Sequence, residues 1–214
     1  MDYLRIYFLR HGQTEQSRAT LFCGSGLNPP LTAEGLEMAN CVAAAHAKTA
    51  WQAIYSSPLL RTVSTAQIVA APHGLQPILD DGLKEIGFGA WEGKTAEAVN
   101  TEFHDDYIRW MADPAWCPPT GGETATVIAS RALPVIERIR AEIPKGEVLV
   151  VSHKATIRIL LCQLLGIDVG RFRFRLDCPV CSISVVDFTK QGPWLRVLAD
   201  RSHLTARLRE LPGT

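Results

Sequence analysis

The sequence predicts an α/β fold: a three-layer α/β/α sandwich with a mostly parallel central sheet. Three observations support this prediction. Short apolar segments alternate with longer segments of helical periodicity, the short segments resemble buried strands, and the helical segments carry capping residues and glycine stops. The chain of 214 residues is about one domain long and large enough to bury roughly 70% of its unfolded surface.

The first part of the chain reads as a strand, a helix and a second strand. Residues 4–9, LRIYFL, are almost wholly apolar, which predicts a buried strand. Residues 31–50 have helical periodicity, and Thr32 is suited to cap the N-terminus of that helix. Residues 53–57, AIYSS, predict another short strand. This order is that of a βαβ unit, whose two strands are parallel.

A second helix is predicted over residues 58–74. Ser57 is a suitable N-cap and Pro58 fits the first turn, where a missing N–H loses no helical hydrogen bond. Gly74 is typical of a helix end. The alternation of strand and helix therefore continues.

The second half of the chain returns to the same pattern after an interruption. Residues 147–153, EVLVVSH, predict a strand that leads into a helix over residues 154–166. Residues 182–188 and 194–200 are expected to be closing strands. Residues 91–121 are rich in Trp and Pro and break the alternation. We expect them to form an insertion that covers one end of the sheet.

Charge and hydropathy narrow the functional classes. Lys plus Arg and Asp plus Glu each number 22, so no net field attracts nucleic acid or an anionic membrane. Arg5 and Arg10 interrupt the apolar N-terminal run, which argues against a signal peptide or a membrane span. We expect residues 1–214 to form a single cytoplasmic domain with no nucleic-acid partner and no membrane partner.

The six cysteines are expected to be mostly reduced and buried, because a chain of this size needs no disulfide framework. Cys178 and Cys181 have CxxC spacing. No second pair completes a zinc site, and no helix follows as a thioredoxin-like motif requires. We therefore expect these two cysteines to serve packing.

Two histidines stand at the ends of two different predicted strands, His11 and His153. In open α/β sheets ligands bind beyond the carboxyl ends of the strands, so the pair favours a shared site over two separate structural histidines. Arg10 and His11 would face opposite sides of a continuing strand. Gly12 permits the turn that would bring both to one site.

Arg61 falls in the first turn of the helix predicted over residues 58–74. The positive end of the helix dipole disfavours a cation there, and a bound anion would remove that unfavourable interaction. The alternative is a solvated surface arginine. Together, Arg10, Arg61 and the helix N-terminus could hold a phosphoryl group through forked, charge-assisted hydrogen bonds.

Glu85 lies among apolar neighbours in the segment GLKEIGFGAWEG. Such surroundings favour a neutral, protonated carboxyl group, which can donate a proton at neutral pH. The alternative is a surface glutamate paired with Lys84.

These residues occur in motifs that resemble the histidine phosphatase superfamily, branch 1, also called phosphoglycerate mutase-like. The motifs follow in the family's order between residues 8 and 158: FLRHGQTE, LTAEG, IYSSPLLRTVSTA, LKEIGFGAWEG, PTGGET and VLVVSHKATIR. The RHG triplet alone is a weak signal, whereas the ordered set is strong. The resemblance implies a phosphoglycerate mutase-like fold and a phosphohistidine enzyme.

The resemblance also implies a role for each principal residue. His11 attacks phosphorus, and Glu85 acts as acid and base. Arg10, Arg61 and His153 bind and stabilise the phosphoryl group. A neutral imidazole can attack if its other nitrogen keeps a proton, which we expect a backbone carbonyl to bind. Since cationic side chains meet the phosphoryl charge, no metal and no other cofactor is expected.

Further contacts are implied less strongly. The resemblance places phosphate-loop contacts near Gly12, Thr14 and Gly24, with Glu123 bordering the site. These positions rank below the five principal residues.

Two positions depart from the family's pattern. Ser17 stands where the family usually has Asn, and a serine is a shorter donor that would contact phosphate differently or through water. Lys154 follows His153 where the family commonly has a small residue. Lys154 would face phosphate or a substrate carboxylate, or else be a solvated lysine at a helix start.

Residues 171–175, RFRFR, alternate arginine with phenylalanine. Such a pattern can stack on nucleic-acid bases, but the neutral overall charge favours a strand edge or a subunit contact. This segment and the closing strands make a homodimer plausible.

The sequence therefore predicts a metal-independent phosphatase that hydrolyses small-metabolite phosphomonoesters through a phosphohistidine on His11. One alternative is a cofactor-dependent phosphoglycerate mutase, which would return the phosphoryl group to substrate rather than give it to water. Another is a noncatalytic protein that binds phosphorylated ligands. The leaving group stays open among phosphoserine, phosphoglycolate, sugar phosphates, α-ribazole phosphate and phosphoglycerates.

Overall fold

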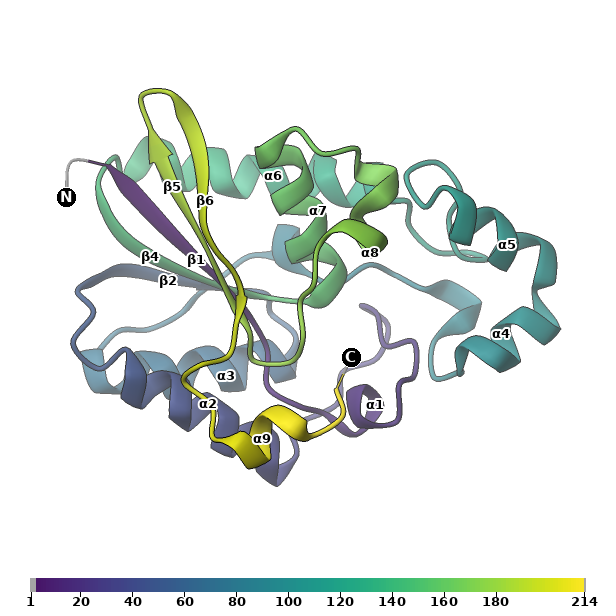
Figure 1. The fold of residues 1–214 in the computed structure, drawn as a ribbon, viewed down its shortest axis with the longest axis horizontal. Coiled ribbons are helices and arrows are strands. Elements are labelled where there is room, and N and C mark those ends of the chain that lie inside the picture. Colours follow the sequence, from purple (N-terminus) through teal and green to yellow (C-terminus); the bar gives the residue numbers. More distant parts are fainter. Residues whose placement is uncertain (1–2, 214) are drawn as a thin grey trace.

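The computed structural model describes residues 3–213, which are built around a six-stranded sheet of order β3-β2-β4-β1-β5-β6 (Figure 1). The strands are β1 (Leu4–Arg10), β2 (Trp51–Ser56), β3 (Ile78–Leu79), β4 (Gly146–Ser152), β5 (Ile183–Thr189) and β6 (Gly192–Asp200). The pairs β3·β2, β2·β4 and β4·β1 are parallel, whereas β1·β5 and β5·β6 are antiparallel. The prediction of a mostly parallel sheet is confirmed.

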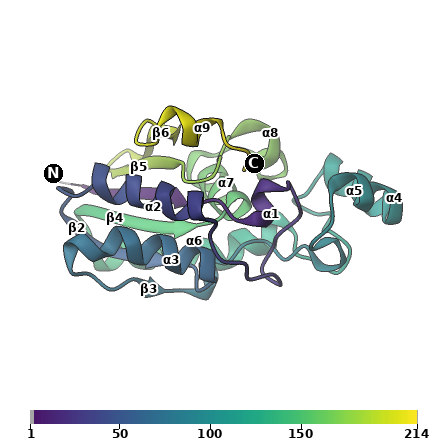
Figure 2. The same cartoon turned by 90° about the horizontal axis from the view of Figure 1, so that it is seen from below.

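Helices cover both faces of this sheet, as Figures 1 and 2 show. The α-helices are α1 (Glu15–Arg18), α2 (Ala33–Ala45), α3 (Leu60–Ala70), α4 (Ala96–Glu102), α5 (His104–Ala112), α6 (Ala125–Glu142), α7 (Lys154–Leu165), α8 (Phe172–Arg175) and α9 (Ala206–Glu210). Helices α6 and α7 pack on one face, and α2 and α3 pack on the other. The three-layer architecture is therefore the predicted one.

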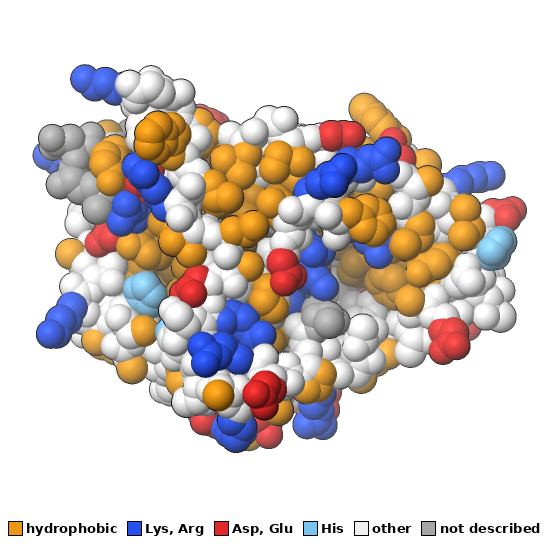
Figure 3. All heavy atoms as spheres, in the orientation of Figure 1, with side chains coloured by type: hydrophobic (Ala, Val, Ile, Leu, Met, Phe, Trp, Pro, Cys, Tyr) orange, Lys and Arg blue, Asp and Glu red, His pale blue; other side chains and the backbone are white. Residues whose placement is uncertain are grey.

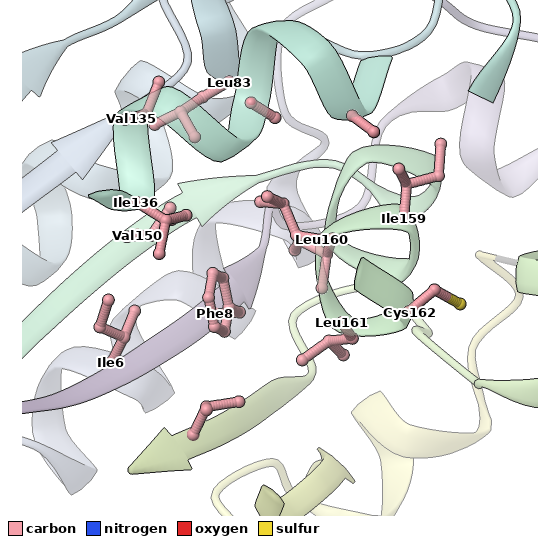
Figure 4. Packing of buried hydrophobic residues seen from close by; sticks show 14 of the residues in the cluster. Ile6, Phe8, Leu83, Val135, Ile136, Val150, Ile159, Leu160, Leu161 and Cys162 are labelled. Carbon is pink, nitrogen blue, oxygen red and sulfur yellow. The ribbon is translucent and has the colours of Figure 1, made fainter. Parts of the chain in front are cut away.

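The core explains why the strand segments are apolar throughout. Along β4, Val148 and Val150 belong to the core under α6 and α7, whereas Leu149 and Val151 belong to the core under α2 and α3. Figure 4 shows Val150 gathered with Phe8 of β1 beneath α6 and α7. A strand buried on both faces needs apolar residues at every position, not at alternate ones.

The helix at the second strand's end begins later than predicted. Leu59, not Ser57, is the N-cap of α3, and it makes no side-chain capping bond. The hydroxyl of Ser57 instead contacts His153 Nε2 at 2.8 Å. Gly74 does end the helical segment, in the left-handed region with φ of 65°. Ser57 therefore contacts His153 at the end of β4 instead of capping α3.

The sequence analysis missed several helical segments, and two of them bear on the site. Helix α6, with Pro134 inside it and Thr124 as its N-cap, is absent from the sequence prediction. An internal proline removes one helical hydrogen bond and obscures the pattern, but burial of one face of α6 in the core stabilises the helix. The RFRFR segment is also helical rather than a strand edge, because residues 172–175 form α8.

Residues 91–121 fold into α4, α5 and their connections, which project from the body at one end of the molecule (Figure 1). Trp91, Val99 and Trp110 form a small separate core there, packed with Phe22 and Phe88. Trp91 and Trp110 therefore pack the projection together, whereas Trp116 is exposed. Among residues 3–213, no helix has both the length and the apolar content that a membrane crossing requires.

Candidate active site

Strand order brings Arg10, His11 and His153 to one edge of the sheet. β1 ends at Arg10 and β4 ends at Ser152, and these two residues are register partners in the parallel β1·β4 pair. His11 and His153 follow directly, and their ring centroids are 5.3 Å apart in an edge-to-face arrangement. The two histidines therefore lie side by side, although 142 positions separate 11 from 153 in the chain.

His11 is held in one tautomer. Its Nδ1 lies 2.7 Å from the carbonyl oxygen of Gly12, which can only accept, so Nδ1 carries the proton. Burial, together with the guanidiniums of Arg61 and Arg10, lowers the pKa of His11 well below its ordinary value. The ring is therefore neutral at pH 7, with Nε2 carrying the unshared electron pair that a nucleophile needs.

Arg61 is fixed by three hydrogen bonds. Its Nη1 donates to Leu27 O at 2.9 Å, and its Nη2 donates to Gly24 O at 3.0 Å. Its Nε donates to Nδ1 of His153 at 3.2 Å. The guanidinium is buried, yet it lines the cavity described below. Its position is thus set before any ligand binds.

His153 is fully buried, and both of its ring nitrogens have partners. Because Nδ1 accepts from Arg61, Nε2 carries the proton and donates to Ser57 Oγ at 2.8 Å. Burial and the charge of Arg61 lower the pKa of His153 well below its ordinary value. Unlike His11, His153 is not among the residues that line the cavity in the described part of the chain.

A cavity of about 330 Å³ opens at this edge of the sheet. Figure 3 shows a hollow between the body and the projecting segment, with Lys or Arg side chains at its wall. The cavity is lined by Arg10, His11, Thr14, Ser17, Thr20, Leu21, Phe22, Cys23, Arg61, Glu85, Phe88, Ala96, Trp110, Lys154, Ala155, Arg158, Phe172 and Arg173. Basic and aromatic side chains therefore line one space.

Glu85 enters this cavity from the loop that precedes the projecting segment. Its Oε1 accepts from the N–H groups of Ile86 at 3.0 Å and Thr156 at 3.2 Å. Its Oε2 accepts from the N–H of Ala155 at 3.2 Å. The neighbouring Leu83 is apolar and fully buried as expected, but the carboxyl oxygens face N–H groups at the start of α7. Glu85 therefore has apolar side chains on one side and main-chain N–H donors at its carboxyl oxygens.

Arg131 of α6 organises the loop that carries Glu85, and sequence reasoning missed it. Its Nη1 donates to Gly82 O at 2.8 Å and to Lys84 O at 2.9 Å. Its Nη2 donates to the Glu85 carbonyl oxygen at 3.0 Å. Glu123, expected to border the site, does not line the cavity in the described chain and instead forms an ion pair with Arg131 at 3.2 Å.

Thr14 and Ser17 line the cavity but bind each other. The Thr14 hydroxyl caps α1 by accepting from the Ser17 N–H, and the Ser17 hydroxyl accepts from the Thr14 N–H at 2.9 Å. The Ser17 hydroxyl also donates to the Thr14 carbonyl at 2.9 Å. A phosphate contact by Ser17 would therefore have to replace or share these local bonds.

Gly12 and Gly24 shape the site through the backbone. A Cβ on Gly12 would lie 2.4 Å from the Gly35 carbonyl oxygen, and one on Gly24 would lie 2.2 Å from the Ile86 carbonyl oxygen. Neither glycine lines the cavity. Their contribution is close backbone packing, and the Gly24 carbonyl also accepts from Arg61.

Lys154 faces the cavity as one reading of the sequence suggested, and it has two basic neighbours that the sequence did not reveal. Arg158 lies one turn further along α7, and Arg173 comes from α8. The spacing of Lys154 and Arg158, i and i+4 on a predicted helix, was the available signal for Arg158. Arg173 could not be placed while its segment was read as a strand edge.

Comparison with known proteins gives a family and several named relatives. The sequence profile of the histidine phosphatase superfamily (branch 1) matches residues 6–201. Phosphoserine phosphatase 1 of Hydrogenobacter thermophilus is 31% identical over 201 residues, covering 94% of each chain. A protein of Proteus mirabilis named "Probable phosphoglycerate mutase GpmB" is 32% identical and covers 94% of this chain and 95% of its own.

A solved structure of similar shape comes from Entamoeba histolytica. It is a phosphoserine phosphatase mutant in complex with phosphoserine. It matches with a TM-score of 0.85 and 27% identity, over 94% of this chain and 100% of that chain. The similarity therefore extends over nearly the whole fold.

Proposed function

The chain belongs to the histidine phosphatase superfamily, branch 1, and we propose that it is a metal-independent phosphatase that hydrolyses phosphomonoesters of small metabolites. The observation that carries this proposal is the tautomer of His11. Its Nδ1–H is bound to the Gly12 carbonyl, which leaves Nε2 as a neutral nucleophile at the cavity wall. Phosphoserine phosphatase 1 and the Entamoeba phosphoserine phosphatase support hydrolysis as the reaction.

In the first step, His11 Nε2 attacks phosphorus. A nitrogen–phosphorus bond forms while the bond from phosphorus to the ester oxygen breaks. Glu85, in its protonated form, gives its proton to the departing alkoxide, so the alcohol leaves neutral. The phosphoryl group is then covalently bound to His11.

The charge that develops on the phosphoryl oxygens is met by Arg10 and Arg61. Arg61 is held in place by backbone carbonyls, and Arg10 Nη1 donates to the carbonyls of Cys178 at 2.8 Å and Gly213 at 3.0 Å. Cations positioned before the reaction stabilise the transition state without reorganisation. His153 supports Arg61, and its Nε2–H would reach the phosphoryl group only by exchanging Ser57 for a phosphoryl oxygen.

In the second step, water cleaves the phosphohistidine. Glu85, now ionised, takes a proton from the water as its oxygen bonds to phosphorus. The nitrogen–phosphorus bond breaks, and inorganic phosphate leaves. Glu85 is again protonated and His11 again neutral, so the cycle closes.

A phosphoglycerate mutase would share the first step. The similarity to the Proteus mirabilis protein named "Probable phosphoglycerate mutase GpmB" supports mutase activity as the alternative function. A mutase would return the phosphoryl group to a second hydroxyl of the substrate. Interconversion of 2- and 3-phosphoglycerate, primed by 2,3-bisphosphoglycerate and faster than phosphate release, would favour it. The noncatalytic binding protein would instead show no turnover on any phosphomonoester.

The direct test is hydrolysis of p-nitrophenyl phosphate in the presence of EDTA. We expect EDTA to leave the rate unchanged and His11→Ala to abolish it. His104→Ala is the matched control, because His104 is an exposed histidine of α5 bonded to Asn100. Loss of activity in EDTA that added divalent ions restore would contradict metal independence, and full activity in His11→Ala would contradict the nucleophile.

We also propose a cytoplasmic location and a small phosphorylated metabolite as the ligand. All six cysteines are free thiols, which suits a reducing compartment. A homodimer, with no nucleic-acid or membrane partner, stays a prediction that size-exclusion chromatography with light scattering would test.

A further inference from the structure

The cavity holds more positive charge than a phosphoryl group needs. Five basic side chains line it: Arg10, Arg61, Lys154, Arg158 and Arg173. Among the described residues, Glu85 is the one carboxylate that lines it. Arg10 and Arg61 together balance a phosphoryl dianion, and the catalytic role of Glu85 concerns the ester oxygen. Three cations on α7 and α8 are therefore left without an assigned anion.

The protein surroundings of Lys154 disfavour its positive charge. It is the first residue of α7, where the helix dipole is positive. Burial, followed by the charges of Arg10 and Arg158, lowers the pKa of Lys154 to about 8, and the smaller effects of Cys178 and Asp177 oppose this shift. In the described part of the chain no carboxylate forms an ion pair with Lys154.

Arg158 and Arg173 are only loosely satisfied by the protein. Arg158 Nη2 lies 3.9 Å from Asp177 Oδ1, and the Asp177 side chain is 74% exposed. The guanidinium of Arg173 lies over the Trp110 ring, 3.8 Å from its centroid, and its Nη1 donates to the sulfur of Met111. Arg158 therefore faces a carboxylate only at long range and in solvent, and the Trp110 and Met111 partners of Arg173 carry no charge.

We propose that Lys154 and Arg158, with Arg173 at the outer edge, form a carboxylate subsite, so that the protein prefers phosphomonoesters whose alcohol carries a carboxylate. This inference rests on the proposed phosphatase function. A planar carboxylate accepts two parallel bonds from a guanidinium fork, which Arg158 can offer beside the Lys154 ammonium. The substrate carboxylate would take the place of the distant, solvated Asp177.

The subsite predicts a large preference between matched substrates. A substrate without the carboxylate would leave partly buried cations unpaired in the complex, which sites of this kind reject strongly. We expect kcat/KM for O-phosphoserine to exceed that for phosphoethanolamine, which lacks only the carboxylate, by about 10²-fold. The same is expected for 3-phosphoglycerate over glycerol 3-phosphate, in which CH₂OH replaces the carboxylate.

Variants identify the residues responsible. Lys154→Met and Arg158→Met should each reduce the preference for 3-phosphoglycerate over glycerol 3-phosphate at least tenfold, mainly through KM for the carboxylate substrate. Arg140→Met is the matched control, because Arg140 lies on the exposed side of α6 in an ion pair with Glu137. Circular dichroism and thermal unfolding check that each variant is folded, and Lys154→Arg should keep the preference if the charge is what matters.

The outcomes separate this inference from the proposed function. Hydrolysis of both members of each pair at similar kcat/KM would overturn the subsite and leave the phosphatase intact. No hydrolysis of any member would overturn the phosphatase itself. Stronger preference for a bisphosphate than for either carboxylate substrate would overturn the carboxylate assignment, because the three cations would then serve a second phosphate.

Discussion

The two parts of the cavity are built differently. We call Arg10, His11, Arg61 and Glu85 the phosphoryl site, and Lys154, Arg158, Arg173 and Trp110 the selecting wall. Carbonyl oxygens and N–H groups of the main chain fix the side chains of the phosphoryl site. Side chains hold the selecting wall, through an aromatic ring, a sulfur atom and a distant carboxylate.

This difference suggests a division of labour. Main-chain partners are not removed by substituting a side chain, so chemistry that depends on them is tied to the fold. The half-buried side chains of α7 and α8 that face the cavity can change without altering the sheet, so they can set which alcohol is accepted. Substitutions in the phosphoryl site should affect every substrate, whereas substitutions in the selecting wall should affect the choice among them.

The largest effect short of losing the nucleophile is expected for Glu85→Gln. Without a group that can donate and accept the proton, kcat should fall about 10²- to 10⁴-fold for all alkyl phosphomonoesters, measured by phosphate release. Esters with acidic leaving groups, such as p-nitrophenyl phosphate, should suffer less in the first step. Glu137→Gln, on the exposed side of α6, is the control. Equal activity of wild type and Glu85→Gln would remove Glu85 from the acid role.

Arg131→Gln should give the next largest effect, acting through position. The variant loses the donor for three carbonyls of the Glu85 loop, so we expect about 2 kcal/mol less stability and a kcat reduced about 10- to 100-fold. Denaturant unfolding and steady-state kinetics measure the two. The control is Arg138→Gln, on the same helix but paired with Asp80. A stability loss with kcat unchanged would show that Arg131 supports only the fold.

The pH dependence of substrate preference should be smaller still. The pKa of Lys154 is lowered to about 8, so its charge is present below pH 8 and is lost as the pH rises through that value. The preference for 3-phosphoglycerate over glycerol 3-phosphate, as a ratio of kcat/KM, should fall up to about tenfold between pH 7 and pH 9.

Lys154→Arg makes this prediction specific, because a guanidinium stays charged throughout that range. Its preference should be flat between pH 7 and pH 9. A wild-type ratio that does not change across that range would exclude Lys154 from recognition, since the other titrations act on both substrates alike.

The smallest effect is expected for Arg173→Met, at the outer edge. Burial lowers the pKa of Arg173 to about 10, and its guanidinium stacks on Trp110 of the projecting segment. We expect KM for 3-phosphoglycerate to rise about threefold and kcat to stay within about twofold. A large fall in kcat for both substrates would place Arg173 in the phosphoryl site.

The difference between the phosphoryl site and the selecting wall also explains which site residues could be predicted from the sequence. His11 and His153 could be brought together because each follows an apolar run and parallel strands end at one edge of the sheet. Arg61 was recognisable because a cation at a helix start needs an anion. These are local signals joined by one rule of sheet topology.

The missed features depend on packing between distant segments. Arg131 reaches the Glu85 loop only because α6, hidden in the sequence by Pro134, packs beside it. Arg173 points into the cavity because its segment turns as a helix, where alternating Arg and Phe suggested an extended strand. The local case is Ser17, whose hydroxyl binds Thr14 in a capping box at the start of α1 although it also lines the cavity. The hydrophobic periodicity of the sequence does not predict these contacts.

The central claim is that Nε2 of His11 carries the phosphoryl group between substrate and water. The most direct measurement mixes the protein with a ³²P-labelled phosphomonoester, quenches in alkali within milliseconds and locates the label by mass spectrometry. We predict up to one phosphate per chain on His11, stable in alkali and lost in acid, with none in His11→Ala. Label on any other side chain, or steady hydrolysis with no phosphoenzyme in either wild type or Glu85→Gln, would contradict the account.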